Sequence, residues 1–296
     1  HKHRRRQRQM CIRDSHVMTG FDPKAFVDLV QRERITHTFL VPPQFSAILS
    51  LENLEKDSFN SLKTILSAGS PLRLDVKENI LTSMSENLFE LYGFSEGFAT
   101  MLKPHDQRKK FGSVGTPVLG FEIKIIDEKG NECSPNVAGE IAGYGAGMMK
   151  EYYSEVELTN SLIWTDNRGR SFIKSGDIGS LDEDGFLTIL DRKKDMIISG
   201  GLNVFPVDIE EVVGKHPDIN DVTVIGVPHE KWGETCVALI SPRDGVEIDC
   251  DEIKNWSNEK LAKHQRLYKV ESREEFPRNA LGKVLKRVLR EPYWSQ

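Results

Sequence analysis

The sequence predicts a multidomain protein that combines α/β and α+β parts, and three observations support this fold class. Its length of 296 residues exceeds that of one average domain. Helix-like and strand-like segments alternate over 16–111, which predicts a partial parallel α/β subdomain. Short strands and turns over 112–190 predict an antiparallel β subdomain, and a third pattern over 191–296 predicts a small C-terminal α+β domain.

The first thirteen residues, "HKHRRRQRQMCIR", differ from the rest because they carry one Lys, five Arg and no acidic residue. They show no apolar periodicity, and no apolar stretch typical of a signal peptide follows them. We interpret residues 1–15 as a non-native basic tail without a role in the fold. The alternative is an arm that binds nucleic acid through its charge. Because we favour the tail, we expect no nucleic-acid partner.

The composition, with 38% hydrophobic and 29% charged residues, is that of an ordinary soluble protein. No apolar run approaches the ~20 residues that a membrane helix needs, so we expect no membrane span. The cysteines are scattered and form no CxxC pair, which argues against a zinc site or a disulfide framework. We therefore expect free thiols in a reducing compartment, the cytoplasm. These cysteines are Cys11, Cys133, Cys236 and Cys250.

The segments over 16–111 read as alternating helices and strands. Asp22 and Pro23 form a typical start signal for the first helix. We expect helices over 22–35, 44–54 and 73–84, and strands within 36–43, 62–72 and 87–96. Ligands of parallel sheets bind at the carboxyl ends of the strands. The stretches "SAGSP" and "YGFSE" follow two of these strands and are the first indication of a site.

Beyond residue 111, turn sequences separate short β-prone segments. We expect turns at 128–131 and 183–185, where Gly follows charged residues. The C-terminal part reads as a strand, a turn and a helix over 196–217, followed by a β-rich stretch over 221–242. Further helices are expected over 251–264 and 282–291.

Five motifs follow one another in an order that resembles the adenylate-forming superfamily, which contains acyl-CoA synthetases, luciferases and the adenylation domains of peptide synthetases. They are "YGFSE", "GEI", "KSGDIG", "DRKKDMIISGGLNVFP" and "PRNALGKVLKR". The resemblance covers about 16–296, and the Gly-Gly pair in "SGGLN" is most similar to the acyl-CoA synthetase branch. It implies an AMP-forming ligase that converts a carboxylic acid and ATP into acyl-AMP and pyrophosphate, and then transfers the acyl group to coenzyme A.

The resemblance also implies the small molecules involved. These are ATP and AMP, Mg²⁺, coenzyme A and a carboxylic acid, which we expect to be fatty or aromatic. Alternative activities are transfer to the phosphopantetheine arm of a carrier protein, oxidation of acyl-AMP as in luciferases, and nucleotide binding without catalysis. No carrier-like "GxDS" segment follows, which favours free coenzyme A. The sequence does not indicate the number of subunits.

The stretch "YGFSE" is similar to a family motif that contacts the nucleotide. By this resemblance, Tyr92 stacks on adenine and Gly93 lets the backbone approach the nucleotide closely. Ser95 stands where the family usually has Thr, and its hydroxyl reaches a phosphate oxygen. Glu96 holds Mg²⁺, a hard cation that prefers carboxylate oxygen.

Two further stretches resemble family contacts to the nucleoside. Gly69, Ser70 and Pro71 in "SAGSPL" are similar to a loop that offers backbone contacts beside the adenine, although an ordinary turn is the alternative. Asp177 in "KSGDIG" resembles the carboxylate that accepts both ribose hydroxyls. Arg192 in "DRKKD" resembles an arginine that also contacts ribose.

Lys283 in "RNALGKVLKR" is the strongest catalytic candidate, by resemblance to a family lysine on a loop of the mobile C-terminal domain. A lysine is a compact charge on a long stem, so it could bridge the substrate carboxylate and the α-phosphate. Lys194 matches the hinge position about which that domain turns. An exposed lysine before a basic helix is the alternative for Lys283, and a solvated charge for Lys194.

For the thioester step, the resemblance implies that Gly200 and Gly201 line the tunnel for the pantetheine arm. A hairpin turn is the alternative for this pair. Trp232 in "HEKWGET" is a candidate contact of coenzyme A, and a half-buried core residue is equally compatible with the pattern.

One family motif is absent, the Gly-, Ser- and Thr-rich loop ending in Gly-x-Pro-Lys that cradles the β- and γ-phosphates. The stretch "SAGSPL" does not replace it, because it lacks the Thr run and the lysine. We therefore expect an N-terminally truncated member of the family. The chain alone would then be incomplete as an enzyme.

Overall fold

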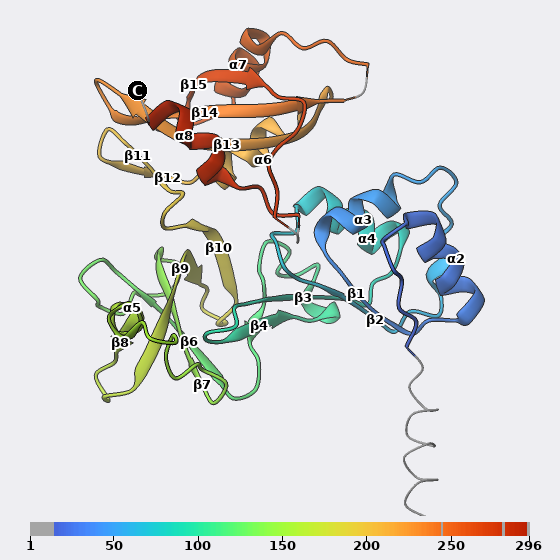
Figure 1. Ribbon diagram of the computed structural model, residues 1–296, viewed down its shortest axis with the longest axis horizontal. Helices are drawn as coiled ribbons and strands as arrows, with labels where there is room; N and C mark the ends of the chain where they lie inside the picture. The colour runs from blue at the N-terminus through green and yellow to red at the C-terminus, as the bar shows by residue number, and fades with distance from the viewer. Residues whose placement is uncertain (1–14, 244, 280–281, 295–296) are drawn as a thin grey trace, which may run out of the picture.

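The computed structural model describes residues 15–243, 245–279 and 282–294. The basic N-terminal residues and Cys11 lie outside this part. The described chain forms three five-stranded sheets, which confirms the predicted combination of a partly parallel α/β unit with antiparallel and α+β units. Figure 1 shows the C-terminal sheet above the other two, with the N-terminal helices to the right and the antiparallel β unit to the left.

The first sheet has the order β1-β2-β3-β4-β5. The first three strands pair in parallel, as predicted, whereas the last two add in antiparallel fashion. Its strands are β1 (His37–Leu40), β2 (Thr64–Ser67), β3 (Leu88–Gly93), β4 (Ala99–Leu102) and β5 (Thr116–Pro117).

The helices of this unit are α2 (Pro23–Glu33), α3 (Pro42–Leu49) and α4 (Leu74–Ser83), with short 3₁₀ turns at Lys56–Phe59 and Pro104–Asp106. The start of α2 is confirmed, because the Asp22 carboxylate accepts a hydrogen bond from the backbone N–H of Ala25 at 2.6 Å. The prediction for α3 placed its start too late. Pro42 and Pro43 open the helix, where a missing N–H costs nothing.

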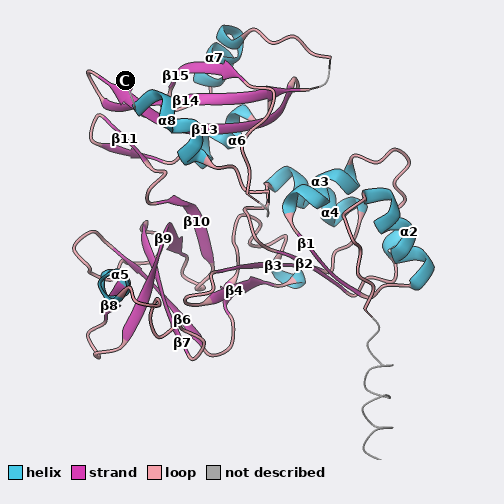
Figure 2. Cartoon of the chain, viewed as in Figure 1, coloured by secondary structure: helices cyan, strands magenta, loops and turns pink. Residues whose placement is uncertain are grey.

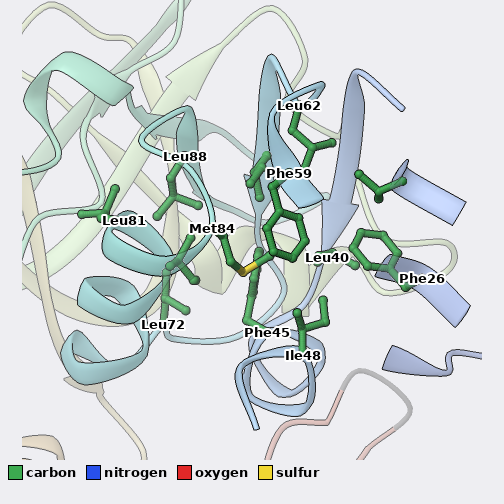
Figure 3. Close-up of a cluster of buried hydrophobic side chains, with 13 residues drawn as sticks. Phe26, Leu40, Phe45, Ile48, Phe59, Leu62, Leu72, Leu81, Met84 and Leu88 are labelled. Atoms are coloured by element: carbon green, nitrogen blue, oxygen red, sulfur yellow. The ribbon is translucent and has the colours of Figure 1, made fainter. Parts of the chain in front are cut away.

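The core of this unit lies between the helices and the parallel strands. Figure 3 shows Phe45, Phe59 and Met84 pointing toward one another within it. Phe45 and Ile80 are fully buried, as is Ile65 on β2. Truncating such a buried phenylalanine to alanine costs about 3–5 kcal/mol, so this core holds the carboxyl ends of the strands in place.

The second sheet is antiparallel and has the order β10-β9-β7-β6, with β8 paired to β9. Both predicted turns are confirmed. In the first, the Asp127 carboxylate accepts hydrogen bonds from the backbone of Lys129 and Asn131, each at 2.8 Å. The helix α5 (Val156–Leu162) was not predicted. The strands are β6 (Phe121–Ile126), β7 (Gly139–Gly145), β8 (Ile163–Thr165), β9 (Ser171–Leu181) and β10 (Leu187–Arg192).

The C-terminal domain is built on the long hairpin β13 (Ile219–His229) and β14 (Gly233–Pro242), and helices cover both of its faces (Figure 2). Val224 and Ala238 pack in one core with α6 and α7, whereas Ile225 and Val237 pack in another with α8. Burial on both faces explains the apolar runs in this part of the sequence. The other elements are β11 (Ile197–Ser199), β12 (Leu202–Val204), α6 (Pro206–Val213), α7 (Cys250–Asn258), a 3₁₀ turn at Lys263–Gln265, β15 (Leu267–Ser272) and α8 (Lys286–Trp294).

Two predicted helix boundaries in this domain were wrong. The helix α7 ends at Asn258, and α8 begins only at Lys286 because the preceding residues take part in a β-bridge between Arg278 and Val284. Gly282, with φ of 81°, adopts a conformation that a helix does not allow. None of the helices in the described part of the chain is long and apolar enough to cross a lipid bilayer.

Candidate active site

Two of the predicted loops lie at one edge of the first sheet. β2 and β3 run in parallel, with Ser67 beside Glu90, so the segments that follow them leave the sheet at the same side. The first loop carries Gly69, Ser70 and Pro71. Gly69 has φ of 95°, a left-handed conformation that favours glycine. The second loop carries the stretch Tyr92–Glu96, at the end of β3, as predicted from the order of elements.

Tyr92 and Asp177 join the first sheet to the second. The Tyr92 hydroxyl donates a hydrogen bond of 2.7 Å to Oδ2 of Asp177, and Asp177 is only 8% exposed. Burial, together with the neighbouring carboxylate, raises the pKa of the tyrosine well above its usual range. The ring of Tyr92 packs edge-on against Phe98, with 5.9 Å between the ring centroids. These contacts hold the tyrosine in one orientation.

Arg192 completes this group from the neighbouring strand. It lies directly opposite Asp177 in the register between β10 and β9, and its Nε is 3.1 Å from Oδ1 of Asp177. The guanidinium is about half exposed, so part of it remains open to a ligand. We call Tyr92, Asp177 and Arg192 the Asp177 cluster. Each carboxylate oxygen has two lone pairs, so the cluster can still accept hydrogen bonds from two hydroxyl groups.

Lys283 belongs to the C-terminal domain, yet its amine is within electrostatic reach of the charges of the Asp177 cluster. Burial and then the charge of Arg192 lower the pKa of its amine, whereas Asp177 and Asp195 act in the opposite direction. Among the described residues, the amine of Lys283 takes part in no ion pair within 4.0 Å. The lysine is therefore half-buried among charges and available to an incoming anion.

The segment that carries Lys283 reaches down to the N-terminal helices (Figure 1). A Cβ atom on Gly282 would lie only 2.7 Å from Cγ of Pro43, at the start of α3. We call residues 278–279 and 282–284 the Lys283 turn. Within it, the backbone N–H of Lys283 donates to Oδ1 of Asn279 at 2.9 Å.

Glu96 has a partner that the sequence did not reveal. The hydroxyl of Tyr152, from the loop after β7, donates a hydrogen bond of 2.7 Å to Oε1 of Glu96. Its other carboxylate oxygen accepts no hydrogen bond within the described residues. That part of the chain has no group of three or more His, Cys, Asp or Glu able to hold a metal. A single carboxylate fits Mg²⁺, which in nucleotide sites takes one or two carboxylates and completes its shell with phosphate and water.

Two other residues of this stretch differ in their surroundings. A Cβ atom on Gly93 would lie 2.4 Å from the backbone oxygen of Phe98, so close packing inside the hairpin itself requires glycine there. Ser95 is exposed in the turn between β3 and β4, and its hydroxyl forms no hydrogen bond with the described residues.

Lys194 lies in the turn between β10 and β11, which joins the second sheet to the C-terminal domain. The backbone N–H groups of Asp195 and Met196 both donate to the carbonyl oxygen of Arg192 at 2.9 Å. Arg290 of α8 donates to the carbonyl oxygen of Lys194 at 3.0 Å and to the carboxylate of Asp195 at 3.1 Å. The predicted hinge position is therefore a turn whose backbone is held by a side chain from the C-terminal domain.

Gly200, Gly201 and Trp232 gather on the C-terminal domain as a second group. The two glycines form the hairpin turn between β11 and β12, with φ of 59° and 79°, as expected for a type I′ turn. A Cβ atom on Gly200 would lie 2.9 Å from the indole ring of Trp232, and the indole is 46% exposed. No hydrogen bond or ion pair among the described residues joins this group to the Asp177 cluster.

Sequence patterns match a known family. The family model described as AMP-binding enzyme matches residues 9–153, and the one described as AMP-binding enzyme C-terminal domain matches 208–283. A feruloyl-CoA synthase from an Amycolatopsis species is 32% identical over 275 residues, which is 92% of this chain and 55% of the relative. The chain thus spans about half the length of the relatives it matches.

Solved structures agree with these matches. ATP-bound MatB from Rhodopseudomonas palustris is 31% identical and superposes with a TM-score of 0.86, covering 94% of this chain and 54% of MatB. The apo form of MatB gives a TM-score of 0.70 over 93% of this chain and 54% of MatB, at 32% identity. The amide bond synthetase McbA from Marinactinospora thermotolerans gives 0.84 at 28% identity, over 93% of this chain and 56% of McbA. The chain belongs to the AMP-binding enzyme family, the adenylate-forming superfamily that its motifs resemble.

Proposed function

We propose that the protein activates a carboxylic acid with ATP to acyl-AMP and transfers the acyl group to coenzyme A. The observation that carries this proposal is the bonded group of Tyr92, Asp177 and Arg192, whose charges act on the amine of Lys283. A domain that follows the hinge turn brings an amine to a carboxylate, a phenol and a guanidinium provided by the other two sheets. This combination suits a reaction in which two anions must meet beside a nucleoside.

Each member of the Asp177 cluster has a role in this proposal. Asp177 accepts the two ribose hydroxyls, and Arg192 contacts the same sugar. Tyr92 offers one face of its ring to adenine. Gly69 and the following two residues provide backbone groups beside the base, and the exposed hydroxyl of Ser95 donates to a phosphate oxygen.

Lys283 has the catalytic role. Its amine bridges the substrate carboxylate and the α-phosphate, so negative charge that develops as the bond forms is stabilised. Glu96 is the proposed Mg²⁺ ligand, and Tyr152 orients its carboxylate through the bond to Oε1. When bound, Mg²⁺ would neutralise charge on the phosphates.

The thioester step uses the second group on the C-terminal domain. Rotation about the hinge turn at Lys194 withdraws Lys283 and brings Gly200 and Gly201 to the acyl-AMP. Glycines at this turn leave room for the pantetheine arm, and the half-exposed Trp232 offers an aromatic face to coenzyme A.

For the acid, an aromatic or fatty carboxylate is favoured. The feruloyl-CoA synthase is a relative whose name specifies an aromatic acid, and Phe94 lies beside the candidate site. The likeness to the amide bond synthetase McbA favours a second candidate, in which an amine replaces coenzyme A as acceptor of the same acyl-AMP.

The test is a screen of the complete gene product that carries this sequence. Pyrophosphate release is measured over aromatic, fatty and short dicarboxylic acids, and products are then identified with coenzyme A or a primary amine as acceptor. We expect acid-dependent pyrophosphate release and a thioester with coenzyme A. An amide without thioester would establish the second candidate. Binding of AMP with no pyrophosphate release for any acid would refute both.

A further inference from the structure

A carboxylate of the C-terminal domain bonds to the Lys283 turn. Asp221 is near the start of β13 and is partly buried. Arg278, at the base of the Lys283 turn, donates through Nη2 to Oδ2 of Asp221. Through Nη1 the same guanidinium donates to the carbonyl oxygen of Gly282 at 2.5 Å. One arginine therefore joins the residue before Lys283 to a carboxylate of the sheet of this domain.

The backbone of the turn is bonded on both sides of Lys283. The N–H of Asn279 donates to the carbonyl oxygen of Lys283 at 2.9 Å, and the N–H of Gly282 donates to Asn279 at 2.9 Å. Arg278 and Val284 form a β-bridge. A lysine side chain has four rotatable bonds and little directional preference, so the position of its backbone decides where the amine can reach.

Arg73 approaches the same region from the other side of the domain boundary. It precedes α4 and forms two bonds of 3.0 Å with Asp75. Its Nη2 lies 3.5 Å from the point that a Cβ atom on Gly214, at the end of α6, would occupy. Burial raises the pKa of Asp221, and the charges of Arg278 and then Arg73 oppose that shift. Two arginines thus act to lower the pKa of Asp221, one of its own domain and one of the N-terminal α/β unit.

The contact across the boundary belongs to one arrangement of the domains. The chain is more similar to ATP-bound MatB than to apo MatB, although the identities are nearly equal. In this arrangement a Cβ atom on Gly282 would also meet the ring of Pro43. Rotation about the hinge turn would carry Asp221 and Gly214 away from Arg73, because those residues lie in the part that rotates and Arg73 does not.

We propose that Asp221 and Arg278 are positioning residues for Lys283, and that Arg73 is a docking residue that favours the arrangement in which Lys283 meets the nucleotide. The inference rests on the proposed function, since it assigns Lys283 to the formation of acyl-AMP. A contact present in one state only biases the equilibrium toward that state. Arg73 therefore assists the first half-reaction, and its loss should not slow the second.

The test uses the complete gene product and two measurements. Hydrogen exchange of the peptide that contains the Lys283 turn is recorded without substrates. The rates of acyl-AMP formation from ATP and of thioester formation from supplied acyl-AMP are measured separately. The variants are Asp221→Asn, Arg278→Ala, Arg278→Lys and Arg73→Ala. Arg287→Ala is the control, because that arginine is 79% exposed on α8 of the same domain.

We expect Asp221→Asn and Arg278→Ala to increase exchange in the turn and to slow acyl-AMP formation by up to about 10²-fold, the effect of a small misplacement. Thioester formation stays within about twofold in both variants. Arg278→Lys keeps a charge facing Asp221 without reaching Gly282 as well, so it falls in between. Arg73→Ala leaves exchange in the turn unchanged and slows acyl-AMP formation about two- to fivefold, the size expected for one exposed charge at the domain boundary.

Three results would overturn the inference: unchanged exchange in Arg278→Ala, equal slowing of both half-reactions in Asp221→Asn, or slower thioester formation in Arg73→Ala. If the gene product forms no acyl-AMP with any acid, the proposed function fails. The exchange measurement then still decides whether Asp221 and Arg278 order the turn.

Discussion

The Asp177 cluster and the Lys283 turn meet at one place but are held there in different ways. Asp177 and Arg192 are neighbours in the register of two long antiparallel strands, and Tyr92 is joined to them by a short hydrogen bond. The Lys283 turn has only a β-bridge, a few backbone bonds and the side chains of Arg278 and Asn279. Groups set by sheet register keep their geometry when domains move, whereas groups on a turn depend on the docking of their domain.

This difference suits a reaction with two steps. In the proposed mechanism, a cluster of unchanged geometry can keep acyl-AMP bound while the C-terminal domain rotates and presents its second group in place of Lys283. Arg192 ends β10 immediately before the turn that carries Lys194, so the proposed rotation about that turn would leave the Asp177 cluster in place. The contrast also predicts which substitutions affect one step and which affect both.

The largest effect is expected for Lys283→Ala, which removes the amine of the Lys283 turn. Loss of the amine should slow acyl-AMP formation by about 10²–10³, by analogy with removal of an oxyanion donor. Thioester formation from supplied acyl-AMP should remain largely intact. Separate assays of the half-reactions check this, with Lys215→Ala as control, since that lysine is 67% exposed on the same domain. Equal loss in both steps would contradict the role of Lys283.

Asp177→Asn tests the Asp177 cluster, which is held by strand register. Removing the negative charge weakens the hydrogen bonds to ribose and the pair with Arg192, and a bond to a charged group contributes about 1.5–3 kcal/mol. AMP affinity should therefore fall about 10- to 100-fold, as measured by calorimetry. Asp184→Asn, in an exposed turn of the same sheet, should change it little. Unaltered AMP affinity in Asp177→Asn would place the nucleoside elsewhere.

Asp191 precedes Arg192 on β10, and its raised pKa predicts that the stability of the protein depends on pH. Burial raises its pKa to about 6, although Lys286 and two backbone N–H groups oppose the shift. The folded protein therefore binds this proton more tightly than the unfolded chain, and stability falls as pH rises from about 4 to 6. Asp191→Asn removes this loss, so its advantage in free energy of unfolding should grow by about 2 kcal/mol between pH 4 and 7.

Urea denaturation of both proteins across this pH range measures the difference directly. Because every other titrating group is shared, the comparison isolates Asp191. If the free energy of unfolding depends on pH in the same way for Asp191→Asn and the unaltered protein, folding does not raise the pKa of Asp191.

The smallest effect is expected for Tyr152→Phe, which removes one hydrogen bond to Glu96, the proposed Mg²⁺ ligand. A hydrogen bond to a charged carboxylate contributes about 1.5–3 kcal/mol. Only the part of this energy that orients the carboxylate affects the metal, so the Mg²⁺ concentration for half-maximal acyl-AMP formation should rise about two- to tenfold. The adjacent Tyr153 is 96% exposed, which makes Tyr153→Phe a matched control. If both variants respond equally to Mg²⁺, Tyr152 does not orient Glu96.

Local patterns predicted much of the fold. The Asp22–Pro23 start signal located α2, and the alternation of helices and strands put the loops "SAGSP" and "YGFSE" at the carboxyl ends of neighbouring parallel strands. The Gly-Gly pair formed the hairpin turn that was held open as an alternative. These features depend on residues close together in the chain, so a window of sequence contains their cause.

Boundaries were less predictable where a distant partner competed with local preference. The residues from Gly282 to Leu285 read as the first turn of a helix, yet they complete the Lys283 turn because Arg278 and Asn279 bond to them. Similarly, Tyr152 was not predicted as a site residue, because its partner Glu96 is 56 positions away and nothing in either stretch indicates the pairing.

By itself, the sequence determined the class of fold, the family and the identity of the chemical groups available, since these follow from composition, periodicity and ordered motifs. Only the tertiary structure decided that Tyr92, Asp177 and Arg192 share one cluster, that Tyr152 bonds to Glu96, and that Arg278 bonds to Asp221. The physical reason is that strand register and domain docking depend on contacts between residues far apart in the chain. Each such contact is selected by the packing of the whole core rather than by its neighbours in sequence.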